Sequence, residues 1–220
     1  MIPYSTSHWA ILGVFGLGAV LCWKVRLSRA AIERIGILTI ACFVVVEIYY
    51  GWPTHFTWKE SLPLELCDAA LLVGGLALYR RLEKLYPFVF FWGFVLSSQA
   101  FLTPLLEYAF PHPVFFTFWI AHLLIVWAAI IVVAQLDYRP TWSDLGSTTG
   151  WTLAYMAIVF AINVVLGANY MYLNAKPAGP TLLDLMGDWP VYVFLAIGVC
   201  SRIRTQNPMK WQFVLSCTNI

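Results

Sequence analysis

The stretch SLPLELCD, which begins at Ser61, places three chemically active side chains in one turn at the start of an apolar segment. Glu65 and Asp68 carry carboxylates, and Cys67 carries a thiol whose ionised form is a nucleophile. Pro63 suits the first turn of a helix and Ser61 suits its N-cap, so we expect a helix to begin here. The positive end of that helix favours the two acidic residues and gives a thiolate modest support.

Two further ionisable residues fall within long apolar segments. Glu47 is a carboxylate that costs several kcal/mol in hydrocarbon unless it has a partner, water or a function. His122, in IAHLLIV, is a base that can also simply join two helices by hydrogen bonds. A free cysteine such as Cys67 is commonly a small buried hydrophobic residue. The residue types alone therefore leave structural and functional interpretations open.

The other cysteines give no sign of a metal or redox site. Cys22, Cys42, Cys200 and Cys217 form no CxxC pair, and the five cysteines of the chain suggest no disulfide framework. There is no HExxH motif either. We therefore expect neither a metal nor a cofactor.

The composition predicts a membrane protein. Hydrophobic residues make up 61% of the 220 residues and charged residues 11%, whereas soluble proteins carry about 25% charged residues. Several segments reach the roughly 20 apolar residues that cross the bilayer, and runs such as LLIVWAAIIVVA lack the period of two that β-barrel strands require. No basic stripe indicates nucleic-acid binding. We expect an all-α, polytopic transmembrane helix bundle that forms a single domain over residues 1–220.

The apolar segments predict about seven spans. The first is expected to be retained, because no basic region or small-residue cleavage site marks a signal peptide. The last, near residues 189–205, is short, with 12 residues from Trp189 to Cys200, so the sequence leaves open whether it completes a span. The predicted segments are His8–Trp23, Ile35–Trp52, Leu62–Tyr79, Tyr86–Leu106, Val114–Leu136, Gly150–Ala168 and one that begins near Trp189.

The basic residues predict the orientation. Of the 13 lysines and arginines, 11 fall on one side when the loops alternate, and only Lys59 and Lys176 fall on the other. The positive-inside rule then places the N-terminus outside and the C-terminus in the cytoplasm of a multi-pass protein, expected in a bacterial cytoplasmic membrane. The 11 residues are Lys24, Arg26, Arg29, Arg34, Arg80, Arg81, Lys84, Arg139, Arg202, Arg204 and Lys210.

In this topology the polar residues of the spans gather in the outer half of the membrane. His122 would lie on the order of 12 Å below the outer surface, with its side chain leaning back toward the helix start. The outer loops 107–116 and 167–192 are rich in aromatic residues, proline and glycine and would cover a cavity there. We therefore expect one polar cavity that contains His8, Glu47, Cys67, Asp68, His122 and Asn163.

Five ordered motifs resemble those of the YwaF-like bacterial integral membrane proteins, from about His8 to Tyr192. They are LPLELCD, FFWGFVLSSQAFLTP, FPHPVFFTFWIAHLLIV, GANYMYLNAKP and LLDLMGDWPVY. Glu65 stands where that pattern leads us to expect histidine or another polar residue, and the tail after about Val199 lacks the apolar run that would complete the last helix. The family is similar to a eukaryotic transmembrane acyltransferase of ether-phospholipid remodelling.

This resemblance implies a catalytic cysteine and histidine at Cys67 and His122. The thiolate would attack a lipid ester while His122 moves the proton, and Asp68 or Glu47 would orient the imidazole. Asn163 or Asn169 would donate to the oxyanion. The expected partners are membrane lipids, and the oligomeric state stays open. The expected substrate-binding residues are His8, Asn163, Asn169, His112, Trp92 and Tyr170.

Three alternatives remain beside a lipid acyltransferase or acyl hydrolase. A small-solute transporter would also bury polar residues, but the chain shows no inverted repeat and little polarity in the inner half. A metal-dependent hydrolase would use His8, His122, Glu47 and Asp68, without a known ligand spacing to support it. A non-catalytic membrane scaffold is the third alternative.

Overall fold

A computed structural model describes residues 4–106, 108–177, 179, 182–193 and 195, and all the regular structure in these residues is helical. This confirms the all-α prediction. The long α-helices are α1 (Thr6–Lys24), α2 (Arg29–Gly51), α3 (Leu66–Arg80), α5 (Pro113–Ala134) and α6 (Trp142–Leu166), and α4 (Tyr86–Phe90) is a short α-helix. The other short helices are η1 (Glu83–Leu85), the π-helical η2 (Phe91–Leu96), η3 (Ser97–Phe101), η4 (Tyr170–Tyr172) and η5 (Leu182–Met186).

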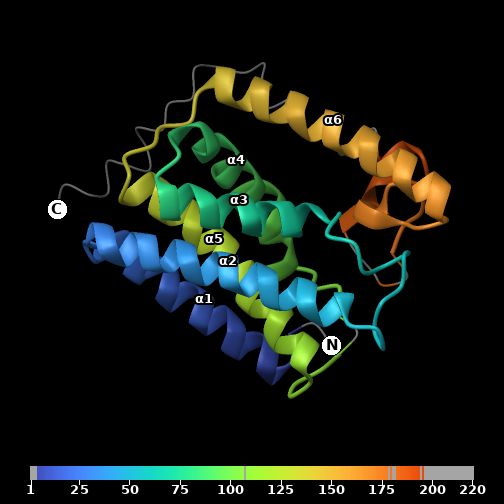
Figure 1. Cartoon of the computed structure of the whole chain (residues 1–220), viewed down its shortest axis with the longest axis horizontal. Helices are drawn as coiled ribbons and strands as arrows, with labels where there is room; N and C mark the ends of the chain where they lie inside the picture. The colour runs from blue at the N-terminus through green and yellow to red at the C-terminus, as the bar shows by residue number, and fades with distance from the viewer. Residues whose placement is uncertain (1–3, 107, 178, 180–181, 194, 196–220) are drawn as a thin grey trace.

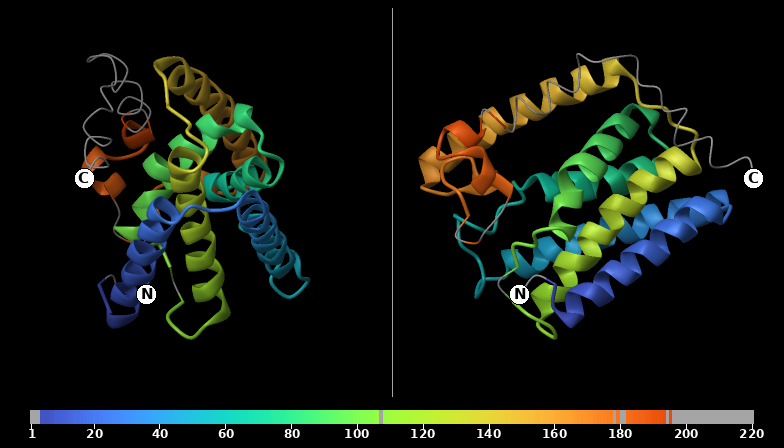
Figure 2. Two further views of the ribbon diagram at one scale, coloured as in Figure 1. Left: turned by 90° about the vertical axis from the view of Figure 1, so that its left-hand side faces the viewer. Right: turned by 180° about the vertical axis from the view of Figure 1, so that it is seen from behind.

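Helix α5 forms the centre of the bundle. It contacts α1, α2, α3 and α4, and these helices lie around it in Figures 1 and 2. Its residues are apolar on every side, as expected for a helix enclosed by other helices. Helix α6 lies apart along the upper edge of Figure 1, where it contacts α4 and η4.

Two glycines allow α2 and α3 to pack closely. A Cβ atom on Gly36 would lie 2.4 Å from the backbone nitrogen of Tyr79, and one on Gly75 would lie 2.6 Å from Cγ1 of Ile40. Small residues at such crossings let helix backbones approach each other, which is the main source of packing between helices in membranes. This contact fixes the position of α3, whose first turn carries Cys67.

The predicted segment Tyr86–Leu106 is helical as far as Phe101, but it is not one regular α-helix. The segment begins as α4, widens into the π-helix η2, tightens into the 3-10 helix η3 and ends at Phe101. The side chains of Ser98 and Gln99 donate to the carbonyls of Phe94 and Val95, and such bonds compete with regular helical hydrogen bonds. The break changes the direction in which the polar residues that follow Leu96 point.

Three helices begin at other residues than the sequence pattern predicted. Helix α2 begins at Arg29, ahead of the predicted Ile35, and Ser28 is its N-cap. Helix α3 begins at Leu66, not Leu62, because Glu65 is the N-cap and its N–H donates to Asp68 Oδ2. The predicted cap, Ser61, instead accepts a hydrogen bond from the backbone of Thr57. Helix α6 begins at Trp142, ahead of the predicted Gly150, because Thr141 and Asp144 form a capping box.

Three helices in the described part of the chain are long and apolar enough to cross a membrane, namely α1, α5 and α6. The turns at residues 25–28, 81–85 and 135–141 lie together at the left end of Figure 1. These turns and the adjoining helix ends carry the basic residues that were assigned to the cytoplasm, from Lys24 to Arg139. The seven-span count and the orientation remain predictions. We call the opposite end of the molecule, which carries the loops at residues 52–65 and 167–177, the outer end, because the predicted topology places it outside. Most of the predicted last segment, 189–205, lies outside the described residues.

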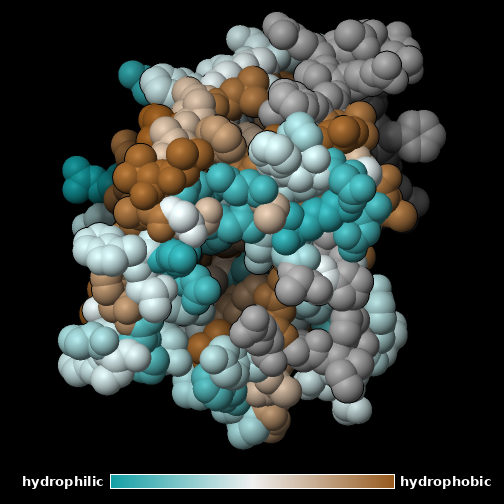
Figure 3. Space-filling view, turned by 90° about the vertical axis from the view of Figure 1, so that its right-hand side faces the viewer, coloured by the Kyte–Doolittle hydropathy of each residue, from teal (hydrophilic) through white to brown (hydrophobic). Residues whose placement is uncertain are grey.

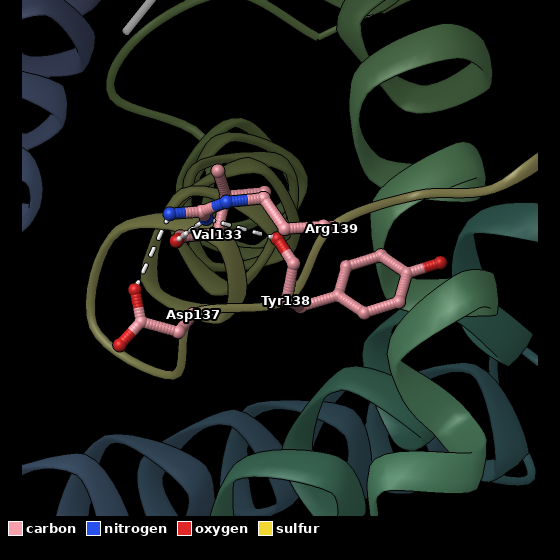
Figure 4. Close-up of polar contacts among 4 residues, drawn as sticks. All are labelled: Val133, Asp137, Tyr138 and Arg139. Carbon is pink, nitrogen blue, oxygen red and sulfur yellow. Dashed lines mark hydrogen bonds and ion pairs between the residues drawn. The ribbon is translucent and has the colours of Figure 1, made fainter. Parts of the chain in front are cut away.

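The turn between α5 and α6 is held by Arg139. Its guanidinium donates to the carbonyls of Val133 and Tyr138 at 3.1 and 3.2 Å and lies 3.3 Å from Asp137 Oδ1, as Figure 4 shows. The ring of Tyr138 extends away from these contacts toward Tyr86 and Phe90 of α4. Arg139 therefore satisfies a carbonyl at the end of α5.

Candidate functional site

Cys67 is the second residue of α3 and is partly buried. Its sulfur lies 3.9 Å from the hydroxyl oxygen of Ser97 in η3. Around it is an apolar cluster built on Ala70, Leu71, Trp92 and Ile125, which come from α3, η2 and α5. The thiol therefore combines a largely apolar environment with one hydroxyl partner.

His122 lies on α5 and is 7% exposed. Its Nδ1 is 2.8 Å from the carbonyl oxygen of Phe118, one turn earlier, and its ring packs against the Phe118 ring with centroids 4.2 Å apart. A carbonyl only accepts, so Nδ1 carries the hydrogen and Nε2 of the neutral imidazole carries the lone pair. The contact confirms that the side chain leans toward the helix start, and it leaves Nε2 as the basic atom.

Cys67 and the chain neighbours of His122 pack against the same apolar cluster from two helices. Ala121 and Leu124, on either side of His122 in the chain, pack against the four-residue cluster that Cys67 contacts. In the described structure no hydrogen bond joins Cys67 to His122, because the thiol contacts Ser97 and the imidazole contacts Phe118. The structure therefore places the thiol against this cluster and shows, in the described residues, no direct bond between the thiol and the imidazole.

Three carboxylates lie near the start of α3. Asp68 interacts electrostatically with Glu47 of α2 and with Glu65, and both Asp68 and Glu65 act on Cys67. One Glu65 oxygen accepts from the backbone N–H of Met171 at 3.0 Å. Within the described ranges none of the three acids forms an ion pair. The structure thus brings Asp68 and Glu65 near the thiol and Glu47 near Asp68, while Glu65 also ties the helix start to the outer loop.

His8 belongs to a different part of the molecule. It is fully buried, its Nδ1 accepts from the N–H of Tyr4 at 2.8 Å, and its Nε2 lies 3.1 Å from the Phe101 carbonyl. Its ring stacks on Trp119 of α5 with centroids 5.5 Å apart. Both ring nitrogens are therefore engaged within the protein, and His8 joins the start of α1 to η3 and α5.

Asn163 and Asn169 hold the outer loop that follows α6. Asn163 is fully buried; its amide nitrogen donates to the Tyr170 carbonyl and to Asn174 Oδ1, while its oxygen accepts from the Tyr170 N–H. The Asn169 amide bonds the backbone of Asn174 and Ala175. Both hydrogens of the Asn163 amide are thus engaged, which leaves none for an oxyanion in this structure.

Tyr170 joins two outer loops. Its hydroxyl donates to the carbonyl of Trp58 and accepts from the N–H of Leu62, each at 3.0 Å. Burial of the side chain raises the pKa of Tyr170, so the hydroxyl stays protonated and keeps its donor role. The loop before α3 and the loop after α6 are therefore fastened to each other above the first turn of α3.

The remaining predicted binding residues have structural contacts. Trp92 is buried and its indole N–H donates to Thr152 Oγ1 of α6 at 2.9 Å, which connects α6 to the bundle. His112 is the N-cap of α5, where its Nδ1 accepts from the N–H of Val114 at 3.2 Å, and its ring stacks on Tyr108. Of these two residues, Trp92 lies in the cluster around Cys67.

Ser97 was not singled out by the sequence patterns. The available signal was SSQ, a polar triplet inside a segment predicted to span the membrane. In the described structure no group of three or more His, Cys, Asp or Glu side chains has an arrangement that could hold a metal ion. The site as observed therefore consists of a thiol, a hydroxyl, an imidazole and nearby carboxylates.

The outer end of the molecule is hollowed. Figure 3 shows this face, with a band of hydrophilic residues above a hollow that has hydrophobic residues inside. A polar rim over an apolar interior is the general pattern of sites for small amphipathic ligands.

The fold and the site are those of an integral membrane protein with polar groups enclosed among apolar helices. The sequence profile of the TMEM164 family matches residues 3–203, so the chain belongs to the TMEM164 family. An uncharacterized protein of Treponema pallidum (strain Nichols) is 32% identical over 215 residues, which cover 89% of this chain and 84% of that protein. No solved structure matches the chain. The match supports TMEM164 membership and not the YwaF-like family named from the motifs.

Proposed function

We propose that this protein transfers acyl groups between membrane lipids, or hydrolyses them, with Cys67 as nucleophile and His122 as base. The observation that carries the proposal is the imidazole tautomer: Nδ1 is held by the Phe118 carbonyl, so Nε2 carries the lone pair that can accept a proton. His122 lies on the helix whose Ala121 and Leu124 pack against the cluster around Cys67. A histidine oriented in this way is the usual partner of a nucleophilic thiol.

In the first step the proton of the Cys67 thiol passes to Nε2 of His122. The sulfur then attacks the carbonyl carbon of a lipid ester, a carbon–sulfur bond forms and the carbon–oxygen bond of the ester breaks. The departing alkoxide takes the proton from His122 and leaves as a lysolipid. The acyl group is then held on Cys67 as a thioester.

In the second step a lipid hydroxyl gives its proton to His122 and attacks the thioester. The new ester bond forms, the carbon–sulfur bond breaks, and the thiolate regains the proton. Water in place of the lipid hydroxyl gives hydrolysis by the same route. The outer hollow with its apolar interior suits an acyl chain below a polar head group.

The start of α3 supplies donors for the oxyanion. The first hydrogen bonds of this turn run from the N–H groups of Asp68 and Ala69 to the Glu65 carbonyl. The preceding amides of Leu66 and Cys67 belong to the set that a helix leaves without intrahelical partners. Because the Asn163 amide is engaged, we assign the oxyanion contact to these two backbone N–H groups.

The test is acyl transfer by the purified protein in phospholipid vesicles with a labelled acyl chain and a lysophospholipid acceptor. Cys67→Ser should lower the rate at least 100-fold, on the order of the loss seen when a nucleophile or base is removed. Cys42→Ser is the matched control, since Cys42 packs against the same cluster from α2, and it should retain the wild-type rate. Equal rates in Cys67→Ser and wild type would remove the nucleophile assignment.

A further inference from the structure

Three consecutive polar residues follow the π-helix, and one of them differs from the other two. Ser98 and Gln99 donate to the carbonyls of Phe94 and Val95, one turn earlier in their own segment. The Ser97 hydroxyl instead reaches across to α3, where it lies 3.9 Å from the sulfur of Cys67. Ser97 is therefore the member of the triplet whose side chain serves another helix.

The apolar surroundings strengthen the effect of this contact on the sulfur. Ser97 is 2% exposed and stands where η2 passes into η3. In a regular helix the residues of this segment would point elsewhere, so the π-helical turn sets the direction of the hydroxyl. Apart from the nearby carboxylates, the thiol is surrounded by apolar side chains, including Trp92 and Leu71. A donor in such a setting has more effect than it would have in water.

We infer that Ser97 is a positioning residue for the Cys67 sulfur. Its hydroxyl holds the sulfur in one orientation and donates its hydrogen to the thiolate form, which supports the reactive state of the nucleophile. The inference rests on the proposed function, in which that thiolate attacks a lipid ester. In this interpretation, the π-helical break in the fourth segment directs the Ser97 side chain toward α3.

The first experiment measures thiol reactivity without any lipid substrate. Cys22, Cys42, Cys200 and Cys217 are replaced by alanine, and the rate of Cys67 alkylation by N-ethylmaleimide is followed from neutral to alkaline pH. Ser97→Ala should lower the rate about tenfold at neutral pH, the size expected for one hydrogen bond to a charged group. The two rates should converge at high pH, where solvent base ionises the thiol. Ser98→Ala is the matched control: the Ser98 hydroxyl bonds the Phe94 carbonyl and not the sulfur, so this variant should lose much less of the rate than Ser97→Ala.

Two further variants separate positioning from a general loss of structure. Ser97→Thr keeps a hydroxyl and should restore the alkylation rate to within about twofold, whereas a packing role alone would make the larger side chain worse than alanine. Ser97→Cys places a second sulfur at the observed contact, and mild oxidation with copper phenanthroline should join it to Cys67 as a disulfide. Ser98→Cys should give no such crosslink.

The outcomes distinguish this inference from the proposed function. A slow Ser97→Ala profile with a crosslink supports positioning even if the wild-type protein transfers no acyl group, in which case only the proposed function fails. Identical alkylation profiles for Ser97→Ala and Ser98→Ala overturn the inference even if acyl transfer depends on Cys67. Absence of the Ser97→Cys crosslink contradicts the contact itself.

Discussion

Helices α5 and α6 are similar in their apolar composition, but α5 is enclosed by other helices and α6 is largely exposed. Both are long and apolar enough to cross a membrane, yet 61% of the most apolar part of α5 is buried in the protein against 11% of α6. Helix α5 touches four other helices, while α6 is connected through Trp92 and through the loops at its outer end. Hydropathy therefore identifies an apolar environment, but it does not tell whether protein or lipid provides it.

The comparison also explains where the site lies. His122 is on the enclosed helix, and Cys67 begins a helix that packs against it, so the reactive groups have rigid support. The exposed apolar face of α6 includes Trp151, Ile158 and Val165 and suits contact with acyl chains. In the proposed function the enclosed helix carries the base, and the exposed one would contact the hydrocarbon.

The largest contrast should come from truncation of aliphatic side chains on the two helices. Ile131 of α5 is fully buried, so Ile131→Ala should lower the free energy of unfolding by about 2–5 kcal/mol. Val165 of α6 is 82% exposed, and Val165→Ala should change it by less than about 0.5 kcal/mol. Thermal unfolding in detergent measures both, and equal shifts would contradict the difference in burial.

Glycine substitutions sharpen the same contrast. A Cβ on Gly93 would lie 2.8 Å from the Cβ of Ala129 on α5, so Gly93→Ala should destabilise the protein by about 1–3 kcal/mol through overpacking. Gly150 of α6 has no neighbour within 4 Å of such an atom. Gly150→Ala should therefore be neutral or stabilise by up to about 1 kcal/mol, in line with helix propensity. A loss of stability in the second variant would show that this part of α6 is enclosed after all.

The next largest effect should come from the hydrogen bonds of Asn163, which attach the outer end of α6 to the loop that follows it. Asn163→Ala removes an amide that bonds Tyr170 and Asn174, and should cost about 1–3 kcal/mol because it leaves a buried N–H unpaired. Limited proteolysis within residues 167–177 should become faster. The exposed neighbour Val164 offers the control, since Val164→Ala should leave the cleavage rate unchanged.

The smallest expected effect concerns the middle of α6. Thr152→Val keeps the shape of the side chain but removes the acceptor for the Trp92 indole, and should cost about 1 kcal/mol. Tryptophan fluorescence should also change, because the indole N–H loses its bond. Thr152→Ser keeps the hydroxyl and should preserve both the stability and the spectrum; if it behaves like Thr152→Val, the bond is not what matters.

Helices α1 and α5 were predicted well from the sequence because their apolar runs are continuous. The predicted His8–Trp23 and Val114–Leu136 differ from α1 and α5 by two residues or fewer at each end. The fourth segment was predicted as one helix because hydropathy does not register side chains that bond to carbonyls, as Ser98 does. The start of α6 was predicted too late because Thr141 and Asp144 lie in a polar stretch, whereas the predicted span covered only the apolar run.

For the site, the sequence identified the polar residues within the apolar segments, but not the direction in which their side chains point. Their depth in the membrane stays a prediction. The single expected cavity included His8 and Asn163, whose nitrogens are engaged in holding α1 and the outer loop. The direction in which a side chain points depends on how neighbouring helices are rotated and shifted against each other. A single sequence does not contain this information. Ser97 was overlooked for the same reason, because its direction depends on the π-helical turn.

The most direct test of the proposed mechanism is mass spectrometry of the peptide that contains Cys67. Purified protein is incubated with phospholipid without an acceptor, quenched with acid and digested. A covalent thioester route predicts an acyl mass on Cys67 that neutral hydroxylamine removes, with no such mass on Cys42. An unmodified Cys67 in protein that is releasing lysolipid would contradict it.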